Sequence, residues 1–144
     1  MKFPKQDPLI EFDYSLRSRY SETDKMGYVY NGRYLEYFEA ARTEMIRSYG
    51  LSYRNMEDEG IMLPVINAEL EYKSPVFYDE EINIKVLLYE VPVARLVTYY
   101  KVVANERQKL CVEGKVVLCF MDEETRRPIR APKFFLDSIP NFSK

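Results

Sequence analysis

Alternation of apolar and polar side chains fills most of the second half of the chain and restricts the folds open to it. Four stretches alternate in this way, at residues 66–73, 82–88, 96–103 and 110–121. In the first stretch the apolar face consists of Ile66, Ala68, Leu70 and Tyr72. Turns near Pro92 and residues 105–108 separate the later stretches. Long alternating segments with short connections predict half-buried strands in an antiparallel meander.

One helix precedes these strands. Apolar residues recur there at spacings of three and four, at Tyr34, Leu35, Phe38, Ala41, Met45, Ile46 and Tyr49. This is the helical period, and Gly50 is a suitable C-terminal stop. Residues 54–59 favour one or two further helical turns, and alternation at 14–20 predicts a first strand. Together these elements predict an α+β fold with the helix packed on one sheet face and with edge strands that favour pairing with a second copy.

Composition narrows the possible functions. A chain of 144 residues without repeats or linkers is expected to form a single domain, 1–144. Its net charge of -2 lacks the basic excess typical of nucleic-acid binding. The chain has no histidine, which excludes a Ser-His-Asp or Cys-His mechanism within it and removes the commonest zinc ligand, so we expect no metal site. Any acid–base chemistry therefore falls to carboxylates.

The two cysteines indicate a reducing compartment. Cys111 and Cys119 lie in one predicted strand, about 25 Å apart, which is far beyond disulfide reach. Residues 1–9 are polar and contain two prolines, unlike a secretory signal, and no segment is long and apolar enough to span a membrane. These features favour a cytoplasmic location.

The segment between the first strand and the helix is the best candidate site. Asp24 stands in a predicted loop, and Asn31 and Gly32 precede the helix. A helix start offers unpaired backbone N–H groups and a partial positive charge, which suit a developing oxyanion. Asn31 is a suitable N-cap. On spacing alone, a solvated turn residue is the more common role for an aspartate such as Asp24.

A longer motif changes the interpretation of Asp24. The motif reads Tyr20-x-Glu22-Thr23-Asp24-x-x-Gly27-x-Val29-Tyr30-x-x-x-Tyr34-Leu35-x-Tyr37-Phe38-Glu39-x-x-Arg42. It closely resembles the opening motif of the hot-dog-fold acyl-CoA thioesterases of the 4-hydroxybenzoyl-CoA thioesterase type, including the group associated with the Tol-Pal system. A weaker resemblance continues through residues 72–82, and only residues 1–13 and 125–144 fall outside it.

The resemblance implies a hot-dog fold, in which a long five-stranded antiparallel sheet wraps around a central helix. It also implies a homodimer or homotetramer with active sites at the subunit interface. Asp24 matches the family's catalytic aspartate, acting as nucleophile or as general base, and the backbone N–H of Asn31 would polarise the thioester carbonyl. The expected substrate is an acyl-CoA, or an acyl carrier protein thioester. No separate cofactor is expected, because coenzyme A is part of the substrate.

The chain also departs from the family pattern. Many members have aspartate at the position of Glu22, and many of the Tol-Pal-associated group have histidine at the position of Asn31. Asparagine keeps the backbone donor but cannot exchange a proton, so we expect lower or differently tuned activity. A non-catalytic module that binds or senses acyl thioesters is therefore the alternative function. A hydratase is less attractive because its acid typically works with a histidine.

Further candidate residues surround this core of the motif. The residues expected to contact substrate are Gly27, Tyr30, Gly32, Tyr34, Asn67, Arg126 and Arg127. The last two form a basic cluster with Arg130 that would suit the phosphates of coenzyme A, although such clusters are also ordinary surface features. Glu39 matches a family glutamate, but its spacing favours a structural ion pair with Arg42.

Overall fold

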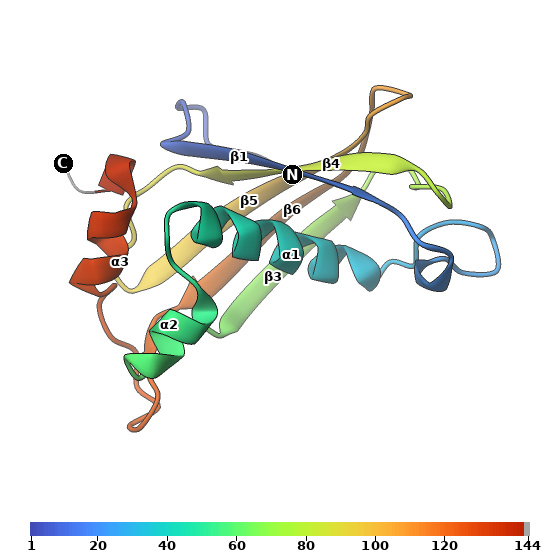
Figure 1. Cartoon of the computed structure of the whole chain (residues 1–144). Coiled ribbons are helices and arrows are strands. Elements are labelled where there is room, and N and C mark those ends of the chain that lie inside the picture. Colours follow the sequence, from blue (N-terminus) through green and yellow to red (C-terminus); the bar gives the residue numbers. More distant parts are fainter. Residues whose placement is uncertain (143–144) are drawn as a thin grey trace.

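The computed structural model describes residues 1–142 and contains one large antiparallel sheet with a helix across one face (Figure 1). The sheet has the order β1-β4-β5-β6-β3. Its strands are β1 (Ile10–Arg17), β3 (Val65–Tyr72), β4 (Glu81–Leu88), β5 (Arg95–Ala104) and β6 (Lys109–Cys119). The helices are α1 (Arg33–Ser48), α2 (Tyr53–Asp58) and α3 (Lys133–Ser138), with 3-10 turns η1 (Tyr20–Glu22) and η2 (Pro140–Phe142). Two short strands, β2 (Ile61–Met62) and β7 (Met121–Asp122), pair separately. The predicted α+β fold, a five-stranded antiparallel sheet around a central helix, is confirmed.

The order of the strands differs from a simple meander. Strands β4, β5 and β6 follow one another in the sheet as predicted, but β3 lies beside β6 at the far edge, and β1 takes the place next to β4. The connection from β3 to β4 is too long for a tight hairpin and contains Pro75. It is held at the end of the sheet, where the Val29 N–H donates to the Val76 carbonyl at 2.8 Å and Tyr28 bridges to Phe77.

Helix α1 packs closely because one glycine makes room for it. The ring of Phe38 stacks on Tyr100 with centroids 4.2 Å apart, and both side chains are fully buried. A Cβ atom at Gly114 in β6 would lie 2.4 Å from the Phe38 ring. Glycine at this position therefore sets how near the helix can approach the sheet.

The first strand begins and ends earlier than the alternation at 14–20 indicates. The inward series starts at Ile10 and continues to Ser18, whose hydroxyl donates to the Phe77 carbonyl and accepts from the Glu80 N–H. The Ser18 backbone still bonds to Glu80 and Asp79, but its hydroxyl takes the Glu80 N–H, and the regular strand ends at Arg17. Tyr20, which the pattern places on the apolar face, lies in η1 and is 78% exposed.

Strand β3 is also more exposed than predicted. Its first five residues are all exposed, including Val65 at 51% and Ile66 at 46%, although alternation predicts one buried face. A bulge shifts the register between Val65 and Asn67. The reason is that β3 is an edge strand, whereas α1 packs mainly against β4 and β1 and leaves the start of β3 uncovered.

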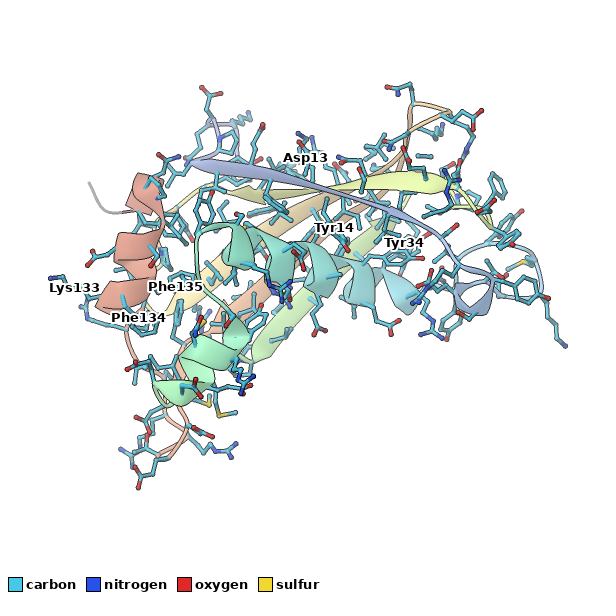
Figure 2. All side chains as sticks on the ribbon, viewed as in Figure 1. Asp13, Tyr14, Tyr34, Lys133, Phe134 and Phe135 are labelled. Atoms are coloured by element: carbon cyan, nitrogen blue, oxygen red, sulfur yellow. The ribbon has the colours of Figure 1, made fainter. Side chains whose placement is uncertain are left out.

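The two ends of the chain complete the packing. The N-terminal segment crosses the outer face of the sheet, where Phe3 lies 5.2 Å from Tyr99 and the Met1 amine pairs with Glu71. The sequence predicts no element near the C-terminus, yet α3 forms there and Phe135 packs edge-on against Phe120 at 5.0 Å. Figure 2 shows Lys133 on the same helix pointing away from the sheet.

Two further sequence expectations concern the whole chain. Both cysteines are buried and unpaired, as their spacing predicts. Among the described residues, no helix combines the length and the apolar character needed to cross a membrane.

Candidate active site

A tight turn fixes Asp24 between β1 and α1. The Gly27 N–H donates to the Asp24 carbonyl at 3.1 Å, and Gly27 adopts a φ of 81°, which favours glycine. The carboxylate Oδ1 accepts from the N–H of Met26 at 2.8 Å and of Tyr28 at 3.4 Å. Aspartate at the first position of a turn commonly bonds its own backbone in this way. Within residues 1–142 the other oxygen, Oδ2, has no hydrogen-bond partner and is open to a ligand.

The helix begins one residue later than predicted, and Asn31 is not its cap. Gly32 holds the N-cap position with φ -71° and ψ -15°, and no side chain caps the helix. Because Gly32 is already helical, the first turn closes through the Arg33 N–H, which donates to Tyr30 O at 2.9 Å. No hydrogen bond in the described part of the chain uses the N–H of Asn31 or Gly32. Two donors therefore remain free at the positive end of α1.

Asp24 and Asn31, one of the two residues with a free N–H group, border one cavity. This cavity has a volume of about 540 Å³ and is lined by Asp24, Tyr30, Asn31, Tyr34 and Tyr72, among others. A second cavity of about 780 Å³ lies against the same loop and is lined by Asp24, Gly27, Tyr30, Arg33 and Tyr78, among others. The fold thus brings together five of the predicted site residues. A carboxylate, a backbone donor and aromatic walls together suit acyl transfer from an activated carbonyl group.

Tyrosines hold the rim of the smaller cavity in place. The Tyr72 hydroxyl, at the end of β3, donates to the Asn31 carbonyl at 3.1 Å, and its ring lies 5.8 Å from that of Tyr34. Burial raises the pKa of Tyr34 to about 12, so its phenol stays protonated and can act only as a neutral group. Figure 2 shows Tyr34 at the first turn of α1. Tyr72 was not among the predicted site residues. Its position on the apolar face, at the end of a predicted strand, is the feature that could have placed it there.

Gly32 has a steric role at the same place. A Cβ atom there would lie 2.9 Å from the ring of Tyr30. Glycine therefore lets this exposed aromatic ring lie against the start of α1, beside the free N–H groups.

Glu22, two residues before Asp24, is an anchor. Its carboxylate is buried and accepts from the Arg19 N–H at 2.7 Å and from the Tyr37 hydroxyl at 2.9 Å. Burial by itself would raise the pKa of Glu22, but these hydrogen bonds and the Arg19 charge outweigh it and hold the pKa below its usual value. Glu22 therefore ties the loop to α1, while the Asp24 carboxylate keeps one oxygen free.

Three predicted site residues lie elsewhere in the chain. Asn67 is exposed near the start of β3, and Arg126 and Arg127 occupy the turn after β7. Strand β7 pairs with β2 just before β3 begins, whereas Asn31 contacts Tyr72 at the other end of β3. Figure 1 shows this turn and the Asp24 loop at opposite ends of the molecule. One chain alone does not bring these residues to Asp24.

The predicted ion pair between Glu39 and Arg42 is absent from the described residues. Arg42 is buried, and its Nε and Nη1 donate to the hydroxyls of Tyr53 at 2.9 Å and Tyr100 at 3.0 Å. Glu39 is exposed and lies near Arg42 at the helix surface, but it forms no ion pair there. The spacing carried the signal: Arg42 follows Phe38 by four residues, which places it on the buried stripe.

Comparisons with known proteins identify the family that this chain resembles. A family model described as the thioesterase-like superfamily matches residues 18–139. YneP of Bacillus subtilis (strain 168) is 32% identical over 119 residues, covering 83% of this chain and 86% of that protein. The acyl-CoA thioester hydrolase YbgC of Escherichia coli O157:H7 is 29% identical over 122 residues, covering 85% and 90%. The crystal structure of a DHNA-CoA thioesterase from Staphylococcus aureus matches with a TM-score of 0.84 and 34% identity, covering 92% of this chain and 89% of that one.

Proposed function

The chain belongs to the thioesterase-like superfamily, and from that membership we propose that it hydrolyses acyl-CoA thioesters with Asp24 as the catalytic carboxylate. Water adds to the thioester carbonyl carbon, the carbon–sulfur bond breaks, and the products are a free acid and the thiol of coenzyme A. The observation that supports this most is the single cavity bordered by the free Asp24 oxygen and the start of α1. Relatives named acyl-CoA thioester hydrolase and DHNA-CoA thioesterase support the same reaction.

The start of α1 stabilises the charge that develops on the substrate. The thioester oxygen accepts from the N–H of Asn31, with the N–H of Gly32 beside it, as the carbonyl becomes tetrahedral. Neither donor loses another bond in doing so, and the helix dipole favours negative charge at this point.

Asp24 supplies the base or the nucleophile. As a base, its carboxylate takes a proton from water, which attacks the carbonyl carbon, and the proton passes to the departing thiolate. As a nucleophile, it displaces the thiolate to form an anhydride that water then hydrolyses. Neither route needs an imidazole, which fits a chain without histidine.

A homodimer would complete the binding site for coenzyme A. Strand β3 is an exposed edge with apolar Val65 and Ile66, which suits pairing with a second β3. A twofold axis makes the two strands antiparallel, so the start of each β3 lies beside the end of the other. The turn carrying Arg126 and Arg127 in one chain then approaches the Asp24 loop of the other, where it can bind the phosphates.

The test is thiol release from short, long and aromatic acyl-CoAs by the wild type and by Asp24→Asn. Asparagine can keep the turn hydrogen bond but cannot act as base or nucleophile, so we expect kcat/KM to fall about a hundredfold or more. Asp137→Asn, at an exposed position on α3, is the matched control and should retain full activity.

Two outcomes would contradict the proposal. Turnover that is indifferent to Asp24→Asn would remove Asp24 from the chemistry. Binding of acyl-CoA without any turnover by the wild type would make the protein a binding module instead.

A further inference from the structure

A third cavity lies beside the middle of α1, away from the Asp24 loop. It has a volume of about 350 Å³ and is enclosed by α1, α2 and the segment from β2 to β3. Its apolar wall consists of Met56, Ile61, Met62, Leu63, Pro64 and Val65. Such a wall suits a hydrocarbon chain, and one buried cation, Arg42, also lines the cavity.

The charge of Arg42 is not neutralised by this chain. Arg42 is 5% exposed, and its two hydrogen-bond acceptors are the phenolic hydroxyls of Tyr53 and Tyr100. No carboxylate among residues 1–142 forms an ion pair with it. A buried cation without an anion is costly, because a low-dielectric interior replaces its water.

One nitrogen of Arg42 is free to bind a ligand. Nη2 donates to no group in the described chain. Every fully buried side-chain nitrogen or oxygen there has a hydrogen-bond partner, so Nη2 must keep some access to solvent. Arg42 is among the residues that line the cavity.

We propose that this cavity binds the far end of the acyl group and that Arg42 selects acyl groups that end in a carboxylate. The inference rests on the proposed function, since it names the substrate class of that reaction. A terminal carboxylate would accept a charge-assisted hydrogen bond from Nη2 and supply the missing negative charge, while the methylene chain lies along the apolar wall.

Two acidic residues on the cavity oppose an anion only weakly. Glu39 and Glu57 also line the cavity, but both are exposed to solvent. Water and salt screen exposed charges far more than buried ones. The buried guanidinium therefore sets the preference, and removing the Glu39 charge should not weaken it.

The position of Arg42 indicates a long acyl group. Arg42 follows Asn31 by eleven residues, a rise of about 16 Å along α1. In the proposed dimer, the start of β3 and the cavity beside it also lie near the Asp24 loop of the other chain. A shorter acyl group bound at that loop would reach the cavity. Probes of two lengths distinguish these arrangements.

The experiment compares kcat/KM within matched pairs, adipoyl-CoA beside hexanoyl-CoA and sebacoyl-CoA beside decanoyl-CoA. We expect the wild type to favour the carboxylate-ended member of at least one pair by about tenfold or more. Arg42→Met should bring that ratio to about one. Arg54→Met, which removes an exposed positive charge from the neighbouring α2, is the matched control and should keep the ratio. Glu39→Gln should keep or raise it.

A binding measurement on the wild type makes the test independent of turnover and of the folding of Arg42→Met. Calorimetry should show sebacate binding at least tenfold more tightly than decanoate. Equal kcat/KM values within both pairs, equal binding of the two acids, or a preference that survives in Arg42→Met would overturn the proposal. A preference for 10-hydroxydecanoyl-CoA as strong as that for sebacoyl-CoA would also overturn it, because a neutral oxygen would then suffice. Absence of turnover with every thioester would contradict the hydrolase instead, while selective sebacate binding would still support the cavity.

Discussion

The two edges of the sheet, β1 and β3, carry similar alternating patterns but differ in what covers them. In β1 the inward residues pack beneath α1 and the outward residues are polar or charged; Figure 2 shows Asp13 and Tyr14 pointing to opposite sides of the strand. In β3 both faces are open over the first five residues. Alternation therefore indicates which side of a strand is apolar, but burial depends on whether another element covers that side.

The chemistry at the two edges also differs. Strand β1 presents Glu11 and Asp13, both paired with Lys85 of β4, and such charges discourage pairing with another sheet. Strand β3 presents Val65 and Ile66 near its start. The difference leads us to treat β1 as a finished edge and β3 as one that a second chain completes.

The sharpest test of that contrast is a charge on each edge. Ile66→Asp places a carboxylate in the proposed interface, so we expect the dimer dissociation constant to rise about a hundredfold or more, measured by sedimentation equilibrium. Ser15→Asp, at an exposed position on β1, should leave assembly unchanged. A dimer that tolerates Ile66→Asp but not Ser15→Asp would reverse the assignment of the edges.

A smaller effect should appear when packing is removed from each edge. Leu16→Ala should lower the free energy of unfolding by about 2 kcal/mol, equally in the wild type and in the Ile66→Asp background, because Leu16 packs on the chain's own core. Leu70→Ala should cost less in the Ile66→Asp background, since part of its burial would come from the partner. Urea unfolding of all four variants measures both values. Equal costs for Leu70→Ala in the two backgrounds would argue against burial by a second chain.

The smallest effect concerns the charges on β1. A hydrogen bond from Asn83 and the Lys85 charge lower the pKa of Asp13, although slight burial opposes them. Because the pKa is lower in the folded state, this stabilisation is complete above the unfolded pKa of about 4 and is lost as pH falls through the folded value. Asp13→Asn should therefore cost about 0.5 kcal/mol at pH 7 and almost nothing near pH 2, measured by urea unfolding. A cost that grew on acidification would contradict this sign.

Much of the fold could be predicted from the sequence, because the period and the spacing of apolar residues are properties of each local segment. The helix and all five long strands lie within a few residues of their expected positions. The place of β3 beside β6 could not be predicted, because it depends on how the segment from Lys73 to Glu80 crosses the end of the sheet. Alternation carries no information on which strands are neighbours.

The candidate site shows the same division. The motif placed Asp24 in a turn and Asn31 before a helix, and the structure brings both to one cavity. The contacts of Arg42 were missed, because spacing along a helix offered Glu39 as a partner while the tertiary fold supplied Tyr53 and Tyr100. Long-range partners of a buried charge are set by packing, which a local pattern does not contain.

The fit of Phe38 against Gly114 also limits how this sequence can change over time. Any side chain at 114 would enter the space of the Phe38 ring, so a change there is tolerated only after position 38 has become smaller. The two positions lie in different elements and are far apart along the chain, yet they should be inherited as a pair. Among relatives that keep this helix at the same distance from the sheet, an aromatic residue at 38 should accompany glycine at 114. The loss of one should be followed by a change in the other.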